Sequence, residues 1–211
     1  MLRRVIVGVE LLNCDCLEYM ATLDDNAFDL VISDPPYGIN INESIGRRKG
    51  DSHSGHKKTY WDNEIPSAEY FKEIRRISKN QIVWGGNYMT EHLPPSPCWI
   101  LWDKGFSELV TFAQFEMAWT SFKTSAKKFD KNPNQANRIH PTQKPIKLYS
   151  WVMGKYSDCS QRILDTHLGS GSSAIAAHYF GCDFVGCELD ENYYKAACER
   201  FDRETRQIAM F

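Results

Sequence analysis

An acid, two prolines and an aromatic residue stand at the end of an apolar run, as Asp34-Pro35-Pro36-Tyr37. Residues 28–33 before them are nearly all apolar, which predicts a buried parallel strand. A carboxylate at the end of such a strand can accept hydrogen bonds from a polar ligand. The prolines restrict the backbone and hold the acceptors still, while the tyrosine ring offers a flat face for stacking. These four residues are therefore the first candidates for a catalytic site.

A glycine loop forms the second candidate site. Residues 165–171 read Asp-Thr-His-Leu-Gly-Ser-Gly, between a predicted strand over 162–165 and a predicted helix over 172–180. Glycines let the backbone approach a ligand closely, and the helix N-terminus behind them favours negative charge. Glu188 ends the next predicted strand, 23 residues after Asp165, close to the ~20 residues at which an acid meets ribose hydroxyls in nucleotide-binding folds. An ordinary strand-to-helix turn followed by a solvated acid is the alternative interpretation.

Length and composition limit the class of protein. The 211 residues predict a single domain over residues 1–211, and the hydrophobic content of 42% is typical of a globular chain. We find no apolar run of 18 residues and expect neither a membrane span nor a signal peptide. The seven cysteines lack zinc-site spacing, so we expect reduced thiols in a cytoplasmic protein without a metal. The formal net charge of −2 does not indicate nucleic-acid binding, although patches of charge can still attract phosphates.

Short apolar segments alternate with amphipathic ones along the chain, which predicts an α/β fold with a mostly parallel sheet. Ser67 and Asp190 are expected to cap helices, and Pro145 suits the first position of another. The expected strands cover residues 9–12, 28–33, 81–84, 99–102, 115–119, 162–165 and 183–188.

Three segments carry a family resemblance. Asp34-Pro35-Pro36-Tyr37 resembles the (D/N/S)PPY motif of N6-adenine and N4-cytosine DNA methyltransferases, and residues 140–145 (HPTQKP) resemble a second segment of these enzymes. Residues 165–171 are similar to their cofactor motif D-P-F-x-G-S-G, with Thr166-His167 in place of Pro-Phe. The order of the motifs resembles the circularly permuted β-group. The resemblance spans nearly the whole chain and implies a Rossmann-like, S-adenosylmethionine-dependent methyltransferase fold with a central twisted sheet.

The resemblance implies a specific chemistry. Asp34 and the Pro35 carbonyl would accept hydrogen bonds from the exocyclic amine of a base that has been flipped out of the duplex and stacked on Tyr37. The methyl group would then pass in line from S-adenosylmethionine, leaving S-adenosylhomocysteine, with no metal involved. The cofactor-binding residues implied by the resemblance and by the glycine loop are Asp15, Cys16, Asp34, Pro141, Thr142, Asp165, His167, Gly169, Ser170, Gly171, Glu188 and Leu189.

Two basic segments, over residues 47–58 and 123–138, lie between the motifs that would face the base. We interpret residues 39–66 as a mobile basic loop region and residues 89–139 as a small target-recognition elaboration. Double-stranded DNA is the expected partner, with phosphate contacts from these segments as an alternative to plain solvated surface. The candidate DNA-binding residues are Arg47, Arg48, Lys49, Lys57, Lys58, Lys127 and Lys128.

The aspartate at the start of the first motif favours adenine N6 as the target, with cytosine N4 as the nearest alternative. A Rossmann-type dehydrogenase would usually carry a third glycine where this chain has Ala174, and would not explain the first motif. A glutamine-modifying protein methyltransferase would carry asparagine first and its glycine loop upstream. A non-catalytic DNA-binding relic is the remaining alternative. A bacterial or phage-encoded restriction–modification enzyme is expected, and a homodimer or a cognate restriction endonuclease is left open as a partner.

Overall fold

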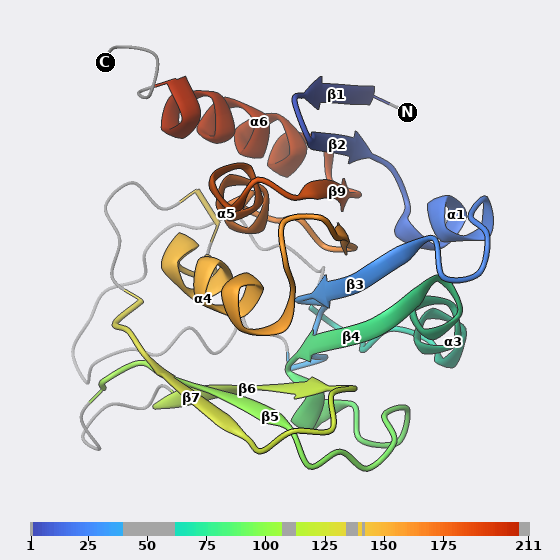
Figure 1. Ribbon diagram of the computed structural model, residues 1–211, viewed down its shortest axis with the longest axis vertical. Helices are drawn as coiled ribbons and strands as arrows, with labels where there is room; N and C mark the ends of the chain where they lie inside the picture. Colours follow the sequence, from blue (N-terminus) through green and yellow to red (C-terminus); the bar gives the residue numbers. More distant parts are fainter. Residues whose placement is uncertain (1, 40–61, 107–112, 134–138, 141, 207–211) are drawn as a thin grey trace.

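The computed structural model describes residues 2–39, 62–106, 113–133, 139–140 and 142–206 (Figure 1). Arg47, Arg48, Lys49, Lys57, Lys58 and Pro141, all named above as candidates, lie outside these ranges. The described strands are β1 (Leu2–Ile6), β2 (Val9–Asn13), β3 (Phe28–Ser33), β4 (Ser78–Trp84), β5 (Trp99–Asp103), β6 (Phe115–Thr120), β7 (Lys127–Asp130), β8 (Arg162–Asp165) and β9 (Asp183–Glu188). The described helices are α1 (Cys16–Ala21), α3 (Ala68–Ile77), the 3-10 turn η1 (Gly86–Tyr88), α4 (Ile146–Tyr156), α5 (Ser172–Phe180) and α6 (Glu191–Thr205).

These strands form one sheet in the order β1-β2-β9-β8-β3-β4-β6-β5-β7. The five central strands, from β2 to β4, are mutually parallel. β1 pairs antiparallel with β2, while β6 is antiparallel to both β4 and β5. The predicted α/β fold with a mostly parallel central sheet is therefore confirmed. The segment over 89–139 contributes β5, β6 and β7 to this same sheet.

Two strands were absent from the sequence prediction. β1 carries two arginines among its five residues, and β7 carries two lysines and an aspartate among its four. Both lie at the edges of the sheet, where only one side of a strand is paired. An edge strand can remain largely exposed, so neither needed the apolar run by which a buried strand is recognised.

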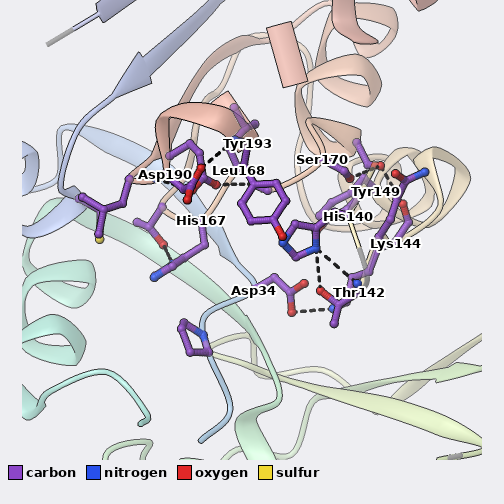
Figure 2. A pocket seen from close by; sticks show the side chains of 18 of the residues that line it. Asp34, His140, Thr142, Lys144, Tyr149, His167, Leu168, Ser170, Asp190 and Tyr193 are labelled. Carbon is purple, nitrogen blue, oxygen red and sulfur yellow. Dashed lines mark hydrogen bonds and ion pairs between the residues drawn. The ribbon is translucent and has the colours of Figure 1, made fainter. Parts of the chain in front are cut away.

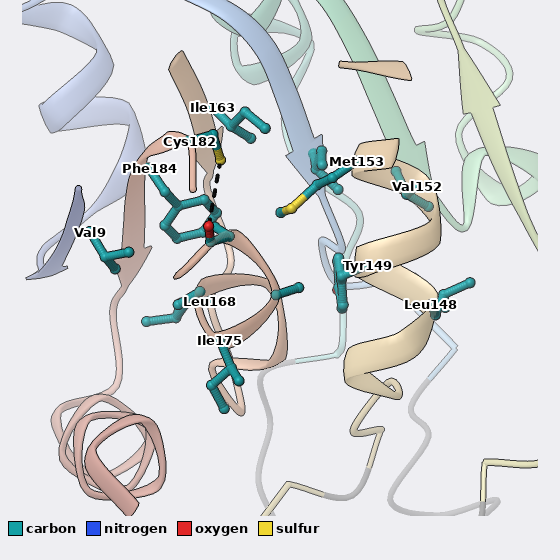
Figure 3. Packing of buried hydrophobic residues seen from close by; sticks show 14 of the residues in the cluster. Val9, Leu148, Tyr149, Val152, Met153, Ile163, Leu168, Ile175, Cys182 and Phe184 are labelled. Atoms are coloured by element: carbon teal, nitrogen blue, oxygen red, sulfur yellow. Dashed lines mark hydrogen bonds between the residues drawn. The ribbon is translucent and has the colours of Figure 1, made fainter. Parts of the chain in front are cut away.

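Helices cover both faces of the sheet. The core on one side packs α4, α5 and α6 against residues such as Leu30, Ile32 and Phe184, and Figure 3 shows part of this cluster. The core on the other side packs α1 and α3 against residues such as Val31 and Leu164. Side chains alternate between the faces of a strand, so burial of both faces explains why β3 is apolar at consecutive positions.

The chain leaves neighbouring strands β3 and β8 in opposite directions across the sheet. β3 leads through α3 to β4 on one side, whereas β8 leads through α5 to β9 on the other. In parallel α/β sheets a crevice forms outside the carboxyl ends of two such strands. The residues that follow β3 begin with Asp34, and those that follow β8 form the glycine loop. The topology therefore brings the two sequence motifs to one crevice.

Candidate active site

A cavity of about 580 Å³ lies at this edge of the sheet (Figure 2). Its size falls within the range typical of small-molecule sites, about 300–1,000 Å³. The walls come from the ends of β2, β3, β8 and β9, from residues 140–144, and from α4 and α6. The lining residues are Cys14, Asp15, Cys16, Asp34, Pro36, His140, Thr142, Gln143, Lys144, Tyr149, Thr166, His167, Leu168, Gly169, Ser170, Ser172, Glu188, Leu189, Asp190 and Tyr193.

The glycine loop is tied to the neighbouring strand ends by hydrogen bonds. The backbone N–H of Gly169 donates to Glu188 Oε2 over 2.8 Å, and that of Asp190 donates to Glu188 Oε1 over 3.0 Å. Gly169 has a φ of 51°, and a Cβ built there would meet its nearest neighbours only at 3.9 and 4.0 Å, at His167 and His140. The absent side chain therefore leaves open space on the wall of the cavity. Burial raises the pKa of the Glu188 carboxyl.

Asp165 and Gly171 stabilise the glycine loop without lining the cavity themselves. Asp165 is buried and accepts hydrogen bonds from the His167 backbone and from Ser173 Oγ, over 2.9 and 2.5 Å. Burial, partly offset by these hydrogen bonds, raises its pKa to about 7. Gly171 precedes α5 with a φ of 73°, and a Cβ there would press on Ala197 at 3.3 Å.

Arg200 is a buried supporting residue that the sequence did not reveal. Its guanidinium donates to the Ser170 carbonyl over 2.7 Å and to Ser172 Oγ over 2.9 Å. Ser172 Oγ in turn donates to the Lys144 carbonyl over 2.7 Å. These bonds join α6, the glycine loop and the segment before α4, so one arginine helps to fix two walls of the cavity.

The HPTQKP segment forms a wall of the cavity. His140 Nδ1 lies 3.0 Å from Thr142 Oγ1, and the His140 ring packs against Tyr193 with centroids 4.5 Å apart. Gln143 is buried, and its Oε1 accepts a hydrogen bond from the Ile139 backbone. Pro145 is the residue immediately before α4, one position earlier than the sequence suggested. Thr142 thus lines the cavity, while His140 helps to order the segment.

Asp15 and Cys16 form the wall at the end of β2. Asp15 caps α1, because its Oδ1 accepts the backbone N–H groups of Leu17 and Glu18 over 2.7 and 3.2 Å. Burial raises the pKa of the Cys16 thiol to about 12, so this thiol is neutral. Leu189, next to Glu188, is 70% exposed and presents an apolar side chain beside the cavity.

Thr166 and His167, which replace the usual Pro-Phe pair, belong to a hydroxyl cluster. Thr166 Oγ1 lies 2.7 Å from Tyr70 Oη, 2.9 Å from Ser33 Oγ and 2.9 Å from His167 Nδ1. Burial lowers the pKa of His167 to about 4, so the imidazole is neutral near pH 7. The polar pair is therefore satisfied by hydroxyl groups that an apolar pair would not need, and His167 still lines the cavity.

The DPPY turn contributes Asp34 and Pro36 to the same cavity. The Tyr37 hydroxyl donates to Asp34 Oδ1 over 2.6 Å. The buried Asp62 accepts the backbone N–H groups of Tyr37 and Gly38 over 2.6 and 3.2 Å and so holds the turn. A small cavity of about 30 Å³ adjoins this turn and is lined by Asp34, Pro35, Tyr37, Asp62, Glu116, Thr142 and Lys144.

The Tyr37 ring rests on the turn that follows β4. It stacks on Tyr88 with centroids 5.4 Å apart and an interplanar angle of 19°. Gly85 has a φ of 68°, and a Cβ built there would lie 2.2 Å from the Tyr37 ring. Gly85 therefore serves both as a turn residue and as the surface against which the ring lies.

Replacement of Gly85 by alanine should displace the Tyr37 ring and strongly reduce any activity of the site. Gly181→Ala is the matched control, because Gly181 has a φ of 80° but a Cβ there would meet nothing within 4 Å. Both variants carry the cost of a left-handed non-glycine residue, about 1–2 kcal/mol. Thermal melting should show destabilisation in both variants, larger in Gly85→Ala because its Cβ also meets the Tyr37 ring, while only Gly85→Ala should lose turnover. Equal turnover in the two variants would contradict the packing role.

The candidate DNA-binding lysines within the described residues lie on β7. Lys128 Nζ contacts Asp103 and Asp130 over 2.9 and 2.8 Å, and Lys127 Nζ contacts Ser125 Oγ over 3.0 Å. The Lys128 charge is thus largely compensated within the protein.

Comparison with known proteins agrees with these features. A family model described as DNA methylase (N6_N4_Mtase) matches residues 102–199, which include the HPTQKP segment and the glycine loop. The type II methyltransferase M.HinfI of Haemophilus influenzae is 24% identical over 90% of this chain and 67% of its own length. The structure of the M1.HpyAVI–SAM complex matches with a TM-score of 0.61 and 16% identity, over 92% of this chain and 99% of that one. The cytosine-N4-specific PvuII DNA methyltransferase matches with a TM-score of 0.62 and 12% identity, over 95% and 92%.

The fold is that of the DNA methyltransferases. The motifs, the family model over residues 102–199 and the named relatives agree, and together they support a member of the N6-adenine/N4-cytosine DNA methyltransferase family. Among the described residues, no helix has the length and apolar character to cross a membrane, and no group of three or more His, Cys, Asp or Glu side chains is arranged to hold a metal ion.

Proposed function

We propose that this protein transfers a methyl group from S-adenosylmethionine to N6 of adenine in double-stranded DNA. The observation that carries the proposal is that one cavity is lined by the glycine loop, by Glu188 and by Asp34. A donor bound along the loop would direct its methyl group toward the acid that accepts the amine. The known cofactor of the M1.HpyAVI complex, which shares the fold, supports this choice of donor.

The residues present suit such a donor. Glu188 uses one lone pair of each carboxylate oxygen on a backbone N–H, which leaves each oxygen able to accept from a ribose hydroxyl. The open space at Gly169 allows close approach of the ligand to the backbone. When bound, S-adenosylmethionine supplies an electrophilic methyl group on a sulfonium. The Asp34 carboxylate would accept one amine hydrogen and the Pro35 carbonyl the other, and Asp34 would take up the proton that the methylated amine releases.

Adenine is favoured over cytosine by the aspartate that opens the DPPY motif. Cytosine N4 is the second candidate, and the likeness in fold to the PvuII enzyme favours keeping it. Single-molecule sequencing of DNA from cells that express the protein would identify the modified base, its position and the recognition sequence together. N6-methyladenine at a defined sequence would support the proposal, whereas N4-methylcytosine would support the alternative. Unmodified DNA from cells that hold soluble protein would support a non-catalytic role.

The basic residues Arg47, Arg48 and Lys49 are proposed to contact DNA phosphates. Their joint replacement by alanine should weaken binding to all DNA sequences alike and flatten its salt dependence, because each phosphate contact adds about −0.9 to the slope of log K against log salt. Filter binding over a salt series measures the slope, and calorimetry should give an unchanged cofactor affinity. Lys128→Ala is the control, since its partners Asp103 and Asp130 already compensate its charge. An unchanged slope in the triple variant would contradict the phosphate contacts and would mean that these three residues are only solvated surface.

A further inference from the structure

A buried lysine links the DPPY turn to a part of the chain that the motifs do not include. Lys144 Nζ lies 2.5 Å from Asp34 Oδ1, 3.0 Å from Glu116 Oε2 and 3.2 Å from the Tyr37 hydroxyl. Its side chain is 2% exposed, and it also lies over the rings of Tyr37 and Trp84, 5.7 and 5.3 Å from their centroids. The ammonium of Lys144 is thus surrounded by two carboxylates and a hydroxyl group.

The three charged residues come from separate elements. Asp34 follows β3, Glu116 lies on β6 and Lys144 precedes α4. Glu116 Oε1 lies 2.5 Å from Lys104 Nζ, so the charges alternate in the order Asp34, Lys144, Glu116, Lys104. Burial opposes ionisation of Glu116, but Lys144 and Lys104 outweigh it and lower the Glu116 pKa to about 2. Glu116 therefore remains negatively charged where it contacts Lys144.

Within the described part of the chain, the contacts on Asp34 fall on one oxygen of its carboxylate. The hydrogen bond from Tyr37 and the ion pair with Lys144 both involve Oδ1, and no described residue contacts Oδ2. Asp34 and Lys144 both line the large cavity, and Figure 2 shows Asp34 near His140 and Thr142, on the side of the cavity from which Lys144 comes. A carboxylate fixed through one oxygen presents the other in a defined direction.

We propose that Lys144, held by Glu116, is a positioning residue that fixes Oδ1 of Asp34 in the ionised carboxylate so that Oδ2 meets the exocyclic amine. This inference rests on the proposed function for the identity of the amine. The orientation and ionisation of Asp34 are properties of the free protein and can be measured without DNA or cofactor.

The two partners of Lys144 act on Asp34 with opposite sign. Burial raises the pKa of Asp34, the Lys144 ammonium lowers it and the Glu116 carboxylate raises it. Loss of the Lys144 charge should therefore raise the Asp34 pKa further, and loss of the Glu116 charge should lower it. The other titratable or charged groups facing Asp34, or lining the two cavities with it, are Cys14, Asp15, Cys16, Tyr37, Asp62, His140, Tyr149, Asp165, His167, Glu188, Asp190 and Tyr193.

The test is a pH titration of the Asp34 carboxyl carbon by NMR in protein labelled with 13C-aspartate, with the signal assigned through Asp34→Asn. Lys144→Met should raise the midpoint by about one pH unit or more, the typical effect of losing an adjacent opposite charge. Glu116→Gln should lower the midpoint. Lys155→Met is the control, because Lys155 is an exposed lysine on α4, and it should leave the midpoint unchanged.

Single-turnover methyl transfer at saturating cofactor gives the second readout. Because the carboxylate is the active form, activity falls as the pH drops through the Asp34 pKa, and the acidic limb should move upward in Lys144→Met and downward in Glu116→Gln. Midpoints that stay fixed, or that move in the same direction in both variants, would overturn the inference. If Lys144→Met does not fold, the inference is tested by Glu116→Gln alone, in which the Asp34 midpoint should move downward. A wild-type protein that transfers no methyl group would contradict the proposed function, while the NMR midpoints would still decide the role of Lys144.

Discussion

Replacement of Asp34 by asparagine should abolish methyl transfer to DNA while leaving cofactor affinity within a few-fold of wild type. Asparagine keeps the size of the side chain, but it carries no charge and cannot take up the amine proton. A positioned proton acceptor contributes about 10²- to 10⁴-fold to rate, and we expect a loss in that range. Tritiated-methyl incorporation under single-turnover conditions measures the rate, and calorimetry measures the binding of S-adenosylmethionine.

Asp183→Asn is the matched control for this substitution, since Asp183 is an exposed acid at the amino end of β9, opposite the site. It should retain full activity. Asp34→Asn also removes one of the charges that Lys144 contacts, so its melting temperature should be recorded alongside. A folded Asp34→Asn protein that methylates DNA at the wild-type rate would exclude Asp34 as the acceptor.

The parts of the fold that were predictable are those in which one short segment carries its own signal. Ser67 accepts a hydrogen bond from the Tyr70 backbone and begins α3, and Asp190 caps α6 in the same way. The buried strand β3, which is covered on both faces, was recognisable by its nearly continuous apolar run. The cavity residues next to the motifs could also be predicted, because the carboxyl ends of parallel strands meet at one edge of the sheet.

The charged network around Lys144 could not be predicted in this way. Glu116 and Lys144 lie 28 residues apart and meet only because β6 folds back beside β4, next to the end of β3. The one local signal was an acid within the apolar strand Phe115–Thr120, since such an acid is costly to bury without a partner. Asp62 is similar, because its role depends on the turn at Tyr37. The circular permutation of the motifs remains a prediction.

The second large effect is expected at Glu188, where glutamine should weaken binding of S-adenosylmethionine by about 10- to 100-fold, the value of one or two hydrogen bonds to a charged group. Glu188 accepts backbone N–H groups from Gly169 and Asp190, and the amide nitrogen of glutamine could accept neither. The variant would therefore lose an acceptor for a ribose hydroxyl and loosen the glycine loop together.

The loss at Glu188 should fall on cofactor affinity, because Glu188 holds the glycine loop and is expected to bind the ribose, whereas Asp34 is expected to accept the amine. Methyl transfer should thus recover toward the wild-type rate when the cofactor concentration is raised. Glu191→Gln is the control, since Glu191 is an exposed acid three residues further along that pairs with Lys195 over 2.5 Å. Its cofactor affinity should match wild type in calorimetry. Tight binding of NADH by the wild-type protein, with no heat from S-adenosylmethionine, would instead identify the loop as a dinucleotide site and contradict the assignment of the donor.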